Sequence, residues 1–259
     1  MSRAIILMYH QVDIPISDKE RRFCVHPDDF DRQINWLIRS GYKFVSLNDI
    51  IEHVSGSEIL PKKTVHITFD DGFVGTFEHA WPVLKKNNIP ATLFAVSGLL
   101  GDSNRWMWQR GFPKRAIISK HQLRELSQEG MCIGSHTCTH PRLTEITSQE
   151  ITEELQKSKK ELEDIIGKKV NNFAYPYGLF NKTIQNLVEK SGYQSACSTR
   201  AGFNRPGEDP LLLRRIDVFG TDRLWQFRQK LTFGVNQSGY FQPLLYYAKR
   251  IVNRITPAR

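Results

Sequence analysis

The chain has 259 residues and a formal net charge of +9, with 40% hydrophobic and 24% charged residues. This composition is that of a soluble globular protein with a substantial core, and no apolar run is long enough to cross a bilayer. The positive charge favours anionic partners such as acidic glycans or a membrane surface. No recognition motif accompanies that charge, so we do not expect a nucleic-acid partner.

Two further features predict a cytoplasmic protein. The four cysteines show no CxxC spacing, which argues against a zinc knuckle and against a dense disulfide framework. The apolar run Ala4–Tyr9 is too short for the hydrophobic region and cleavage site of a secretory signal, but it has the length of a buried strand. We therefore expect reduced thiols and a cytoplasmic location.

Predicted strands and helices alternate along the chain. Ser46, Ser119 and Thr147 each precede an Asp, Gln or Glu by three positions, the spacing of a helix-capping box. Pro82 must mark either a helix start or a kink. The predicted strands are Ala4–Tyr9, Tyr42–Val45, Thr64–Phe69, Ala91–Val96, Met131–Gly134, Asn172–Tyr175, Gln194–Ser198 and Arg215–Phe219. The predicted helices are one from Pro27 to Gly41, one capped by Ser46, and Thr76–Asn87, Ser119–Glu129, Thr147–Ile166 and Lys182–Ser191.

This alternation predicts a mostly parallel sheet, either open or closed into a barrel. No internal repeat or linker divides the chain, so we expect one domain over residues 1–259 with a helical appendage from about 221. The end of that appendage, Pro243–Ile255, mixes apolar residues with lysine and arginine. It could dock onto the core or make peripheral contact with a membrane surface.

Two adjacent carboxylates, Asp70 and Asp71, follow the predicted strand Thr64–Phe69 and precede Gly72. Sites in α/β folds are built at this end of a strand. Neighbouring residues of a strand point to opposite faces, but a turn at Gly72 can direct both acids to one pocket. One carboxylate can then bind a cation while the other transfers protons. The alternative is that Asp-Asp-Gly is only a turn.

His136 and His140 follow the predicted strand Met131–Gly134 at a spacing that suits one metal ion. Together with Asp71 they offer two imidazoles and one carboxylate, which leaves coordination positions open. This set suits Zn²⁺, and also Fe²⁺, Co²⁺ or Ni²⁺. A third motif, Ala174–Gly178, holds Tyr177 between a proline and a glycine, where a rigid backbone N–H can donate to an oxyanion.

The order and content of these motifs resemble the polysaccharide deacetylase family, the NodB-homology domains of carbohydrate esterase family 4. Thr68–Gly72 resembles the first motif of that family, Ser135–Pro141 the second and Ala174–Gly178 the third. Leu7–His10 and Leu213–Val218 resemble members associated with exopolysaccharide synthesis.

The resemblance spans residues 4–220 and implies a distorted (β/α) barrel with about seven parallel strands. It implies that Asp71, His136 and His140 hold a divalent metal, most simply Zn²⁺. It also implies that Asp70 is the general base towards metal-activated water and that the Tyr177 backbone N–H stabilises the oxyanion. The reaction implied is removal of N-acetyl groups from amino sugars, by a hydrolase acting on carbon–nitrogen bonds other than peptide bonds.

The chain departs from the family pattern at two positions. Ala174 stands where the third motif often has the arginine that orients the base, and Arg215 is a candidate replacement. The family often uses a late histidine as the general acid, but no histidine follows His140, so His10 is the candidate by its position after the first strand.

Trp106 and Trp108 are candidates for stacking on sugar rings. The expected substrate is an N-acetylated oligo- or polysaccharide, or a lipid-linked glycan precursor. The alternative is a catalytically impaired glycan-binding module on the same fold.

Overall fold

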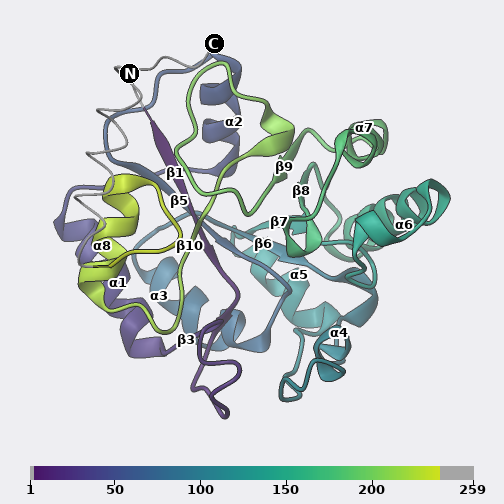
Figure 1. Ribbon diagram of the computed structural model, residues 1–259, viewed down its shortest axis with the longest axis horizontal. Coiled ribbons are helices and arrows are strands. Elements are labelled where there is room, and N and C mark those ends of the chain that lie inside the picture. Colours follow the sequence, from purple (N-terminus) through teal and green to yellow (C-terminus); the bar gives the residue numbers. More distant parts are fainter. Residues whose placement is uncertain (1–2, 240–259) are drawn as a thin grey trace.

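The computed structural model describes residues 3–239, and these form a curled parallel sheet surrounded by helices (Figure 1). The strands are β1 (Ala4–Tyr9), β2 (Gln11–Val12), β3 (Cys24–Val25), β4 (Lys43–Phe44), β5 (Thr64–Phe69), β6 (Ala91–Ala95), β7 (Cys132–Ser135), β8 (Asn172–Ala174), β9 (Ser195–Cys197) and β10 (Ile216–Asp217). The helices are α1 (Pro27–Arg39), α2 (Leu47–Ser55), α3 (Trp81–Lys86), α4 (Arg105–Trp108), α5 (Lys120–Gln128), α6 (Ser148–Ile166), α7 (Lys182–Lys190) and α8 (Leu224–Phe233).

The main sheet has the order β10-β1-β5-β6-β7-β8-β9, with β4 added beside β5, and all its pairs are parallel. The two ends of this order approach each other, because Leu213, just before β10, pairs with Cys197 of β9. The predicted distorted barrel of about seven parallel strands is thereby confirmed. The carboxyl ends of all these strands lie at one end of the sheet, which is where a site is expected.

The two faces of the curled sheet differ in chemistry because side chains alternate along each strand. Val65, Ile67 and Phe69 of β5 belong to the large outer core that packs against the helices. His66 and Thr68 point the other way and are fully buried. A second cluster of buried apolar side chains, which includes the apolar face of α2, fills the inside of the curled sheet. Figure 1 shows α2 at the end of the sheet where β1 begins.

The helix ends follow local rules visible in the sequence. Capping boxes are formed at Ser46, Ser119 and Thr147, as their spacing predicts. Pro82 is the second residue of α3, which follows a π-helical turn at Thr76–Ala80, so the proline stands at a helix start. None of the helices within residues 3–239 is long and apolar enough to cross a membrane. The predicted segment Pro243–Ile255 lies outside the described residues.

The buried His66 makes a pH-dependent contribution to stability. Its Nδ1 lies 2.8 Å from the Val45 carbonyl oxygen and its Nε2 lies 2.9 Å from Thr92 Oγ1. Burial lowers the pKa of His66 from 6.5 to about 4. Because the unfolded chain takes up the proton first, this stability is complete above pH 6.5 and is lost as the pH falls towards 4.

We expect the metal-free wild type to lose about 3 kcal/mol of unfolding free energy over that pH interval relative to His66→Gln. Urea unfolding of both proteins at a series of pH values measures the difference. If the unfolding free energies of the two proteins change equally from pH 7 to pH 4, His66 is not the source of this pH dependence.

Candidate active site

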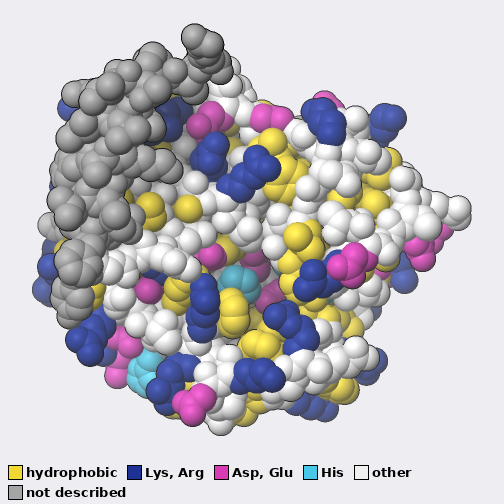
Figure 2. All heavy atoms as spheres, viewed as in Figure 1, with side chains coloured by type: hydrophobic (Ala, Val, Ile, Leu, Met, Phe, Trp, Pro, Cys, Tyr) yellow, Lys and Arg dark blue, Asp and Glu magenta, His cyan; other side chains and the backbone are white. Residues whose placement is uncertain are grey.

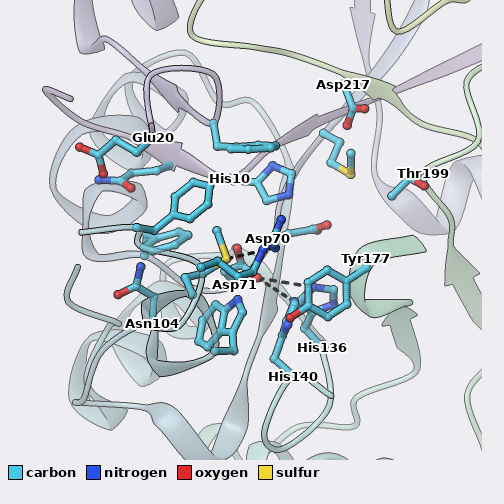
Figure 3. A pocket seen from close by; sticks show the side chains of 18 of the residues that line it. His10, Glu20, Asp70, Asp71, Asn104, His136, His140, Tyr177, Thr199 and Asp217 are labelled. Carbon is cyan, nitrogen blue, oxygen red and sulfur yellow. Dashed lines mark hydrogen bonds and ion pairs between the residues drawn. The ribbon is translucent and has the colours of Figure 1, made fainter. Parts of the chain in front are cut away.

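The carboxyl ends of the strands surround one cavity (Figure 3). Its polar side chains come from segments that follow or end β1, β5, β7, β9 and β10, together with loop residues that close its sides. They are His10, Gln11, Glu20, Asp70, Asp71, Asn104, Arg110, His136, His140, Tyr177, Thr199 and Asp217. The structure therefore gathers in one cavity most of the site residues predicted from separate motifs.

Asp70 and Asp71 both reach this cavity because the backbone turns between them. Asp70 continues the inward alternation of His66 and Thr68, whereas an extended Asp71 would point to the outer core. Asp71 instead has φ +73° and is followed by Gly72 at φ +87°. A left-handed conformation is costly for a residue other than glycine. Its presence here directs the second carboxylate to the same cavity.

The Asp70 carboxylate is held by Arg215 from the segment that precedes β10. Arg215 Nη1 lies 2.6 Å from Asp70 Oδ1 and Nη2 lies 2.7 Å from Oδ2, a bidentate pair in which both side chains are buried. The Arg215 Nε–H donates to the Ser198 carbonyl oxygen at 3.0 Å. Burial raises the pKa of Asp70, but Arg215 and then His136 outweigh it and hold that pKa below its usual value. Asp70 is therefore an oriented carboxylate.

Asp71, His136 and His140 form a compact group whose potential ligand atoms lie within 4.8 Å of one another. Asp71 Oδ1 is 3.5 Å from His136 Nε2 and 3.3 Å from His140 Nε2. Burial raises the pKa of Asp71, but the adjacent histidines, His140 first, lower it to about 2. All three side chains are buried, and Figure 3 shows them converging on one point.

The protonation state of His136 shows that this group fits a cation. Its Nδ1 lies 2.8 Å from the Ala174 carbonyl oxygen, which only accepts, so Nδ1 carries the ring proton. Burial lowers the pKa of His136 to about 4, which leaves the ring neutral near pH 7. Its Nε2 lone pair then faces Asp71 Oδ1, a buried oxygen that has no hydrogen-bond partner among residues 3–239. Two such acceptors facing each other are what a divalent metal requires.

The loop between the two histidines is fastened to α6 by Glu154. Its carboxylate accepts hydrogen bonds from the backbone N–H groups of Cys138 and Thr139, at 2.7 and 2.9 Å, and from Thr139 Oγ1 at 2.7 Å. Within this loop Thr137 and His140 have φ of +66° and +61°, so the fastening holds a strained backbone. Nothing in the motif itself pointed to this glutamate.

We expect Glu154→Ala to weaken divalent-metal binding by about 10- to 100-fold, as is typical for the loss of a group that orients metal ligands. The matched control is Glu153→Ala on the same helix, because that side chain is exposed and its hydrogen bond within the described part of the chain is to Gln149. Competition with a chromogenic chelator measures both affinities. Equal metal affinities in the two variants would show that the loop holds its shape without Glu154.

Two aromatic rings enclose His140. The Trp106 ring stacks on it at 4.7 Å between centroids and the Tyr177 ring meets it edge-on at 4.5 Å. Tyr177 has φ +58°, and Gly178 after it leaves no room for a side chain beside Thr199. Trp108 does not line the cavity; it is 42% exposed and faces Lys114.

The remaining wall is formed by His10, after β1, and by Asp217, at the end of β10 (Figure 3). His10 is half-buried and its ring packs edge-on against Phe23 at 5.7 Å. Burial raises the pKa of Asp217, while His10 and Arg215 act in the opposite direction. Asp217 was not predicted as a site residue, although it belongs to the segment Leu213–Val218 that carried part of the family resemblance.

Comparison with known proteins agrees with this geometry. A family model described as polysaccharide deacetylase matches residues 57–196. The chain belongs to the polysaccharide deacetylase family. The predicted family and the predicted hydrolase class are thereby confirmed, and the chain is a deacetylase that acts on polysaccharide.

Two curated relatives cover most of the deacetylase. It is 29% identical over 213 residues to the putative polysaccharide deacetylase YxkH of Bacillus subtilis, covering 82% of this chain and 70% of YxkH. It is 30% identical over 211 residues to a poly-β-1,6-N-acetyl-D-glucosamine N-deacetylase of Staphylococcus aureus, covering 77% of this chain and 70% of that protein.

Two solved structures share the fold of the deacetylase. PplD of Streptococcus pyogenes, solved with acetate, has a TM-score of 0.75 and 28% identity, covering 88% of this chain and 97% of its own. IcaB of Ammonifex degensii has a TM-score of 0.73 and 28% identity, covering 84% of this chain and 92% of its own.

Proposed function

We propose that this deacetylase is a metal-dependent hydrolase that removes N-acetyl groups from amino sugars of a polysaccharide or of a lipid-linked glycan precursor. The observation that carries the proposal is the pairing of two carboxylates with different partners in one cavity. Asp71 faces two histidines, and Asp70 beside it is held by an arginine. This arrangement provides a cation site and a separate proton acceptor within reach of one substrate group.

Asp71, His136 and His140 would hold the metal, since their buried donor atoms lie close enough together for one ion. One carboxylate and two imidazoles favour Zn²⁺, with Co²⁺, Fe²⁺ or Ni²⁺ able to use the same ligands. When bound, the cation supplies Lewis acidity, which lowers the pKa of water and polarises the acetyl carbonyl group.

The other side chains have distinct roles in the proposed reaction. Asp70 accepts a proton from the water that attacks the acetyl carbonyl carbon, and Arg215 positions the Asp70 carboxylate for that transfer. The backbone N–H of Tyr177 donates to the oxyanion. As the carbon–nitrogen bond breaks, His10 donates a proton to the leaving sugar amine. Acetate and a free amino sugar result.

The amino-sugar specificity is supported by the S. aureus relative, whose name gives poly-β-1,6-N-acetyl-D-glucosamine as the polymer on which that protein acts. Trp106 lines the cavity beside His140 and offers a ring face to a sugar. The exposed Trp108 lies outside the cavity wall, so we propose no contact between it and the reacting sugar unit.

The alternative of an impaired glycan-binding module depended on Ala174 and on the absence of a late histidine. Arg215, in the segment before β10, makes a bidentate contact with Asp70 and could replace the arginine that the third motif lacks. His10 lies on the cavity wall, and we propose it as the proton donor in place of the late histidine. Both features favour the enzyme over the binding module.

The test begins with metal-free protein reloaded with Zn²⁺ and incubated with N-acetylglucosamine oligomers and with a lipid-linked acceptor. We expect acetate release that stops when a chelator is added. His136→Ala is expected to lower both metal affinity and acetate release, because it removes one ligand. Absence of acetate from every glycan, with stoichiometric metal bound to the wild type, would overturn the proposal.

A further inference from the structure

The mouth of the cavity carries two arginines that are held against its aromatic wall. The Arg142 guanidinium lies 4.8 Å from the Tyr177 ring centroid. The Arg110 guanidinium lies 6.0 Å from the same centroid and 5.6 Å from that of Phe112, which also lines the cavity. Stacking of this kind restrains a guanidinium while its N–H donors remain available to a ligand.

Two further cations lie at the same mouth. Lys19 Nζ is 5.8 Å from the Phe112 ring centroid. The Arg22 guanidinium is 5.9 Å from the centroid of Phe23, another cavity-lining ring, and 4.2 Å from that of Phe219, which lies outside the cavity lining. We call Lys19, Arg22, Arg110 and Arg142 the rim cations. All four are exposed. Figure 2 shows basic side chains gathered around a hollow in which acidic and histidine side chains are visible.

The rim cations lack strong anionic partners within residues 3–239. Lys19, Arg22 and Arg110 have no carboxylate at salt-bridge distance in this part of the chain. Among the same described residues, Arg142 reaches only Glu145, at 3.6 Å on an exposed surface, where an ion pair contributes little. Positive charge therefore accumulates at the mouth with little neutralisation by the carboxylates of residues 3–239.

The acids inside the cavity do not use these cations. Asp70 is paired with the buried Arg215, and Glu20 is paired with Arg115 at 2.6 Å. Asp71 faces the two histidines of the candidate metal site. These three acids thus have partners other than the rim cations, and the rim cations are left for a ligand.

We propose that the mouth of the cavity binds an anionic group, a phosphate or a carboxylate, carried by the glycan beside the sugar that loses its acetyl group. This inference rests on the proposed function and adds a charged substrate class to it. Tyr177 contacts both Arg142 and His140, so the rim lies next to the candidate metal site. An anion bound there belongs to the neighbouring sugar unit or its linkage. Guanidinium groups suit it because they donate two parallel hydrogen bonds to phosphate or carboxylate.

An anionic membrane surface could also offer phosphate groups to the rim cations, but the concave shape of the cavity favours a glycan. The rim cations surround a concave cavity lined by Phe23, Phe112 and Tyr177, and rings in a hollow stack on sugar units. A flat lipid surface would meet the rim without entering that hollow. Binding to vesicles without a preference for a phosphorylated glycan would therefore oppose the proposal.

The experiment compares two soluble ligands, an N-acetylglucosamine tetramer and the same tetramer carrying one phosphate monoester. Calorimetry with Zn²⁺-loaded protein gives the dissociation constant of each. We expect the wild type to bind the phosphorylated tetramer about tenfold more tightly, equivalent to about 1.4 kcal/mol. Raising the salt concentration to about 0.5 M should remove most of this preference, because exposed charges are then screened.

The decisive variant combines Arg110→Gln with Arg142→Gln and is expected to bring the ratio of the two dissociation constants close to one. Its control combines Lys62→Gln with Lys190→Gln, which removes the same charge from exposed sites near the amino ends of β5 and β9. The control should keep the wild-type ratio. Equal binding of both tetramers by the wild type, or a ratio unchanged in the Arg110/Arg142 variant, would overturn the proposal.

Two parallel measurements separate this inference from the proposed function. Acetate release from both tetramers with no binding preference leaves the deacetylase activity standing and overturns the anion site. A rim-dependent preference without acetate release supports the anion site and counts against the proposed activity. Sedimentation with phosphatidylglycerol vesicles tests the lipid source. Vesicle binding that depends on Arg110 and Arg142, without preference for the phosphorylated tetramer, overturns the glycan proposal.

Discussion

Asp70→Asn is expected to abolish acetate release while the protein keeps its metal. Asparagine has nearly the shape of aspartate but cannot accept the proton from the attacking water, and loss of such a base typically costs about 10²- to 10⁴-fold in rate. Asp71, His136 and His140, which we propose as the metal ligands, are unchanged in this variant. The amide also places a donor opposite Arg215, so the bidentate contact is lost along with the charge.

Parallel assays of metal content and of acetate release decide this prediction. Asp49→Asn is the matched control, because this substitution makes the same chemical change in the capping box of α2, away from the cavity. The control should retain wild-type turnover with a small loss of stability. If metal-loaded Asp70→Asn keeps more than about a tenth of wild-type turnover, Asp70 is not the base.

The fold could be predicted from the sequence because its signals are local. Alternating hydrophobic residues mark β5, and capping residues mark the starts of α2, α5 and α6, so the sequence predicts a parallel α/β sheet. The two-residue strands β2 and β3 and the single turn of α4 were not predicted, because segments that short show no periodicity. Of the predicted strand Arg215–Phe219, the segment Ile216–Asp217 forms a β-strand in the structure.

The candidate site was predictable where its chemistry lies in contiguous motifs at strand ends. Asp71 and His136 belong to such motifs, and the parallel sheet brings their ends together. Contacts made across the fold were harder to infer. Arg215 is 145 positions from Asp70, so the sequence could suggest it as a candidate but not show the bidentate pair. Glu154 acts through backbone N–H groups, which carry no sequence signature.

The left-handed backbone of the site explains part of what could not be predicted from the sequence. Asp71, Thr137, His140 and Tyr177 all have positive φ, a conformation that sequence rules assign to glycine. Strand alternation alone would send Asp71 away from Asp70. The tertiary contacts around these residues, including the backbone hydrogen bonds that Glu154 accepts, hold conformations that the local sequence disfavours. Such strain concentrates where side chains must converge on one point.

The second large effect is expected at Arg215. Arg215→Leu removes the partner of a carboxylate that is 2% exposed, and an unpaired buried charge of this kind costs about 3–5 kcal/mol of unfolding free energy. Arg215→Lys keeps the charge but loses the bidentate geometry, so its loss of stability should be smaller. Turnover should fall in both variants, because Asp70 is no longer held in its orientation.

A double-mutant cycle distinguishes this charge effect from simple loss of packing. In the Asp70→Asn background the carboxylate that pairs with Arg215 is absent, so Arg215→Leu should cost much less there than in the wild type. Urea unfolding of the four metal-free proteins near pH 7 supplies the free energies. A loss of stability that is equal in both backgrounds would mean that Arg215 acts through its packing on Phe94, at 5.6 Å, and not through Asp70. A large coupling would establish that the ion pair stabilises the inside of the sheet and also orients Asp70.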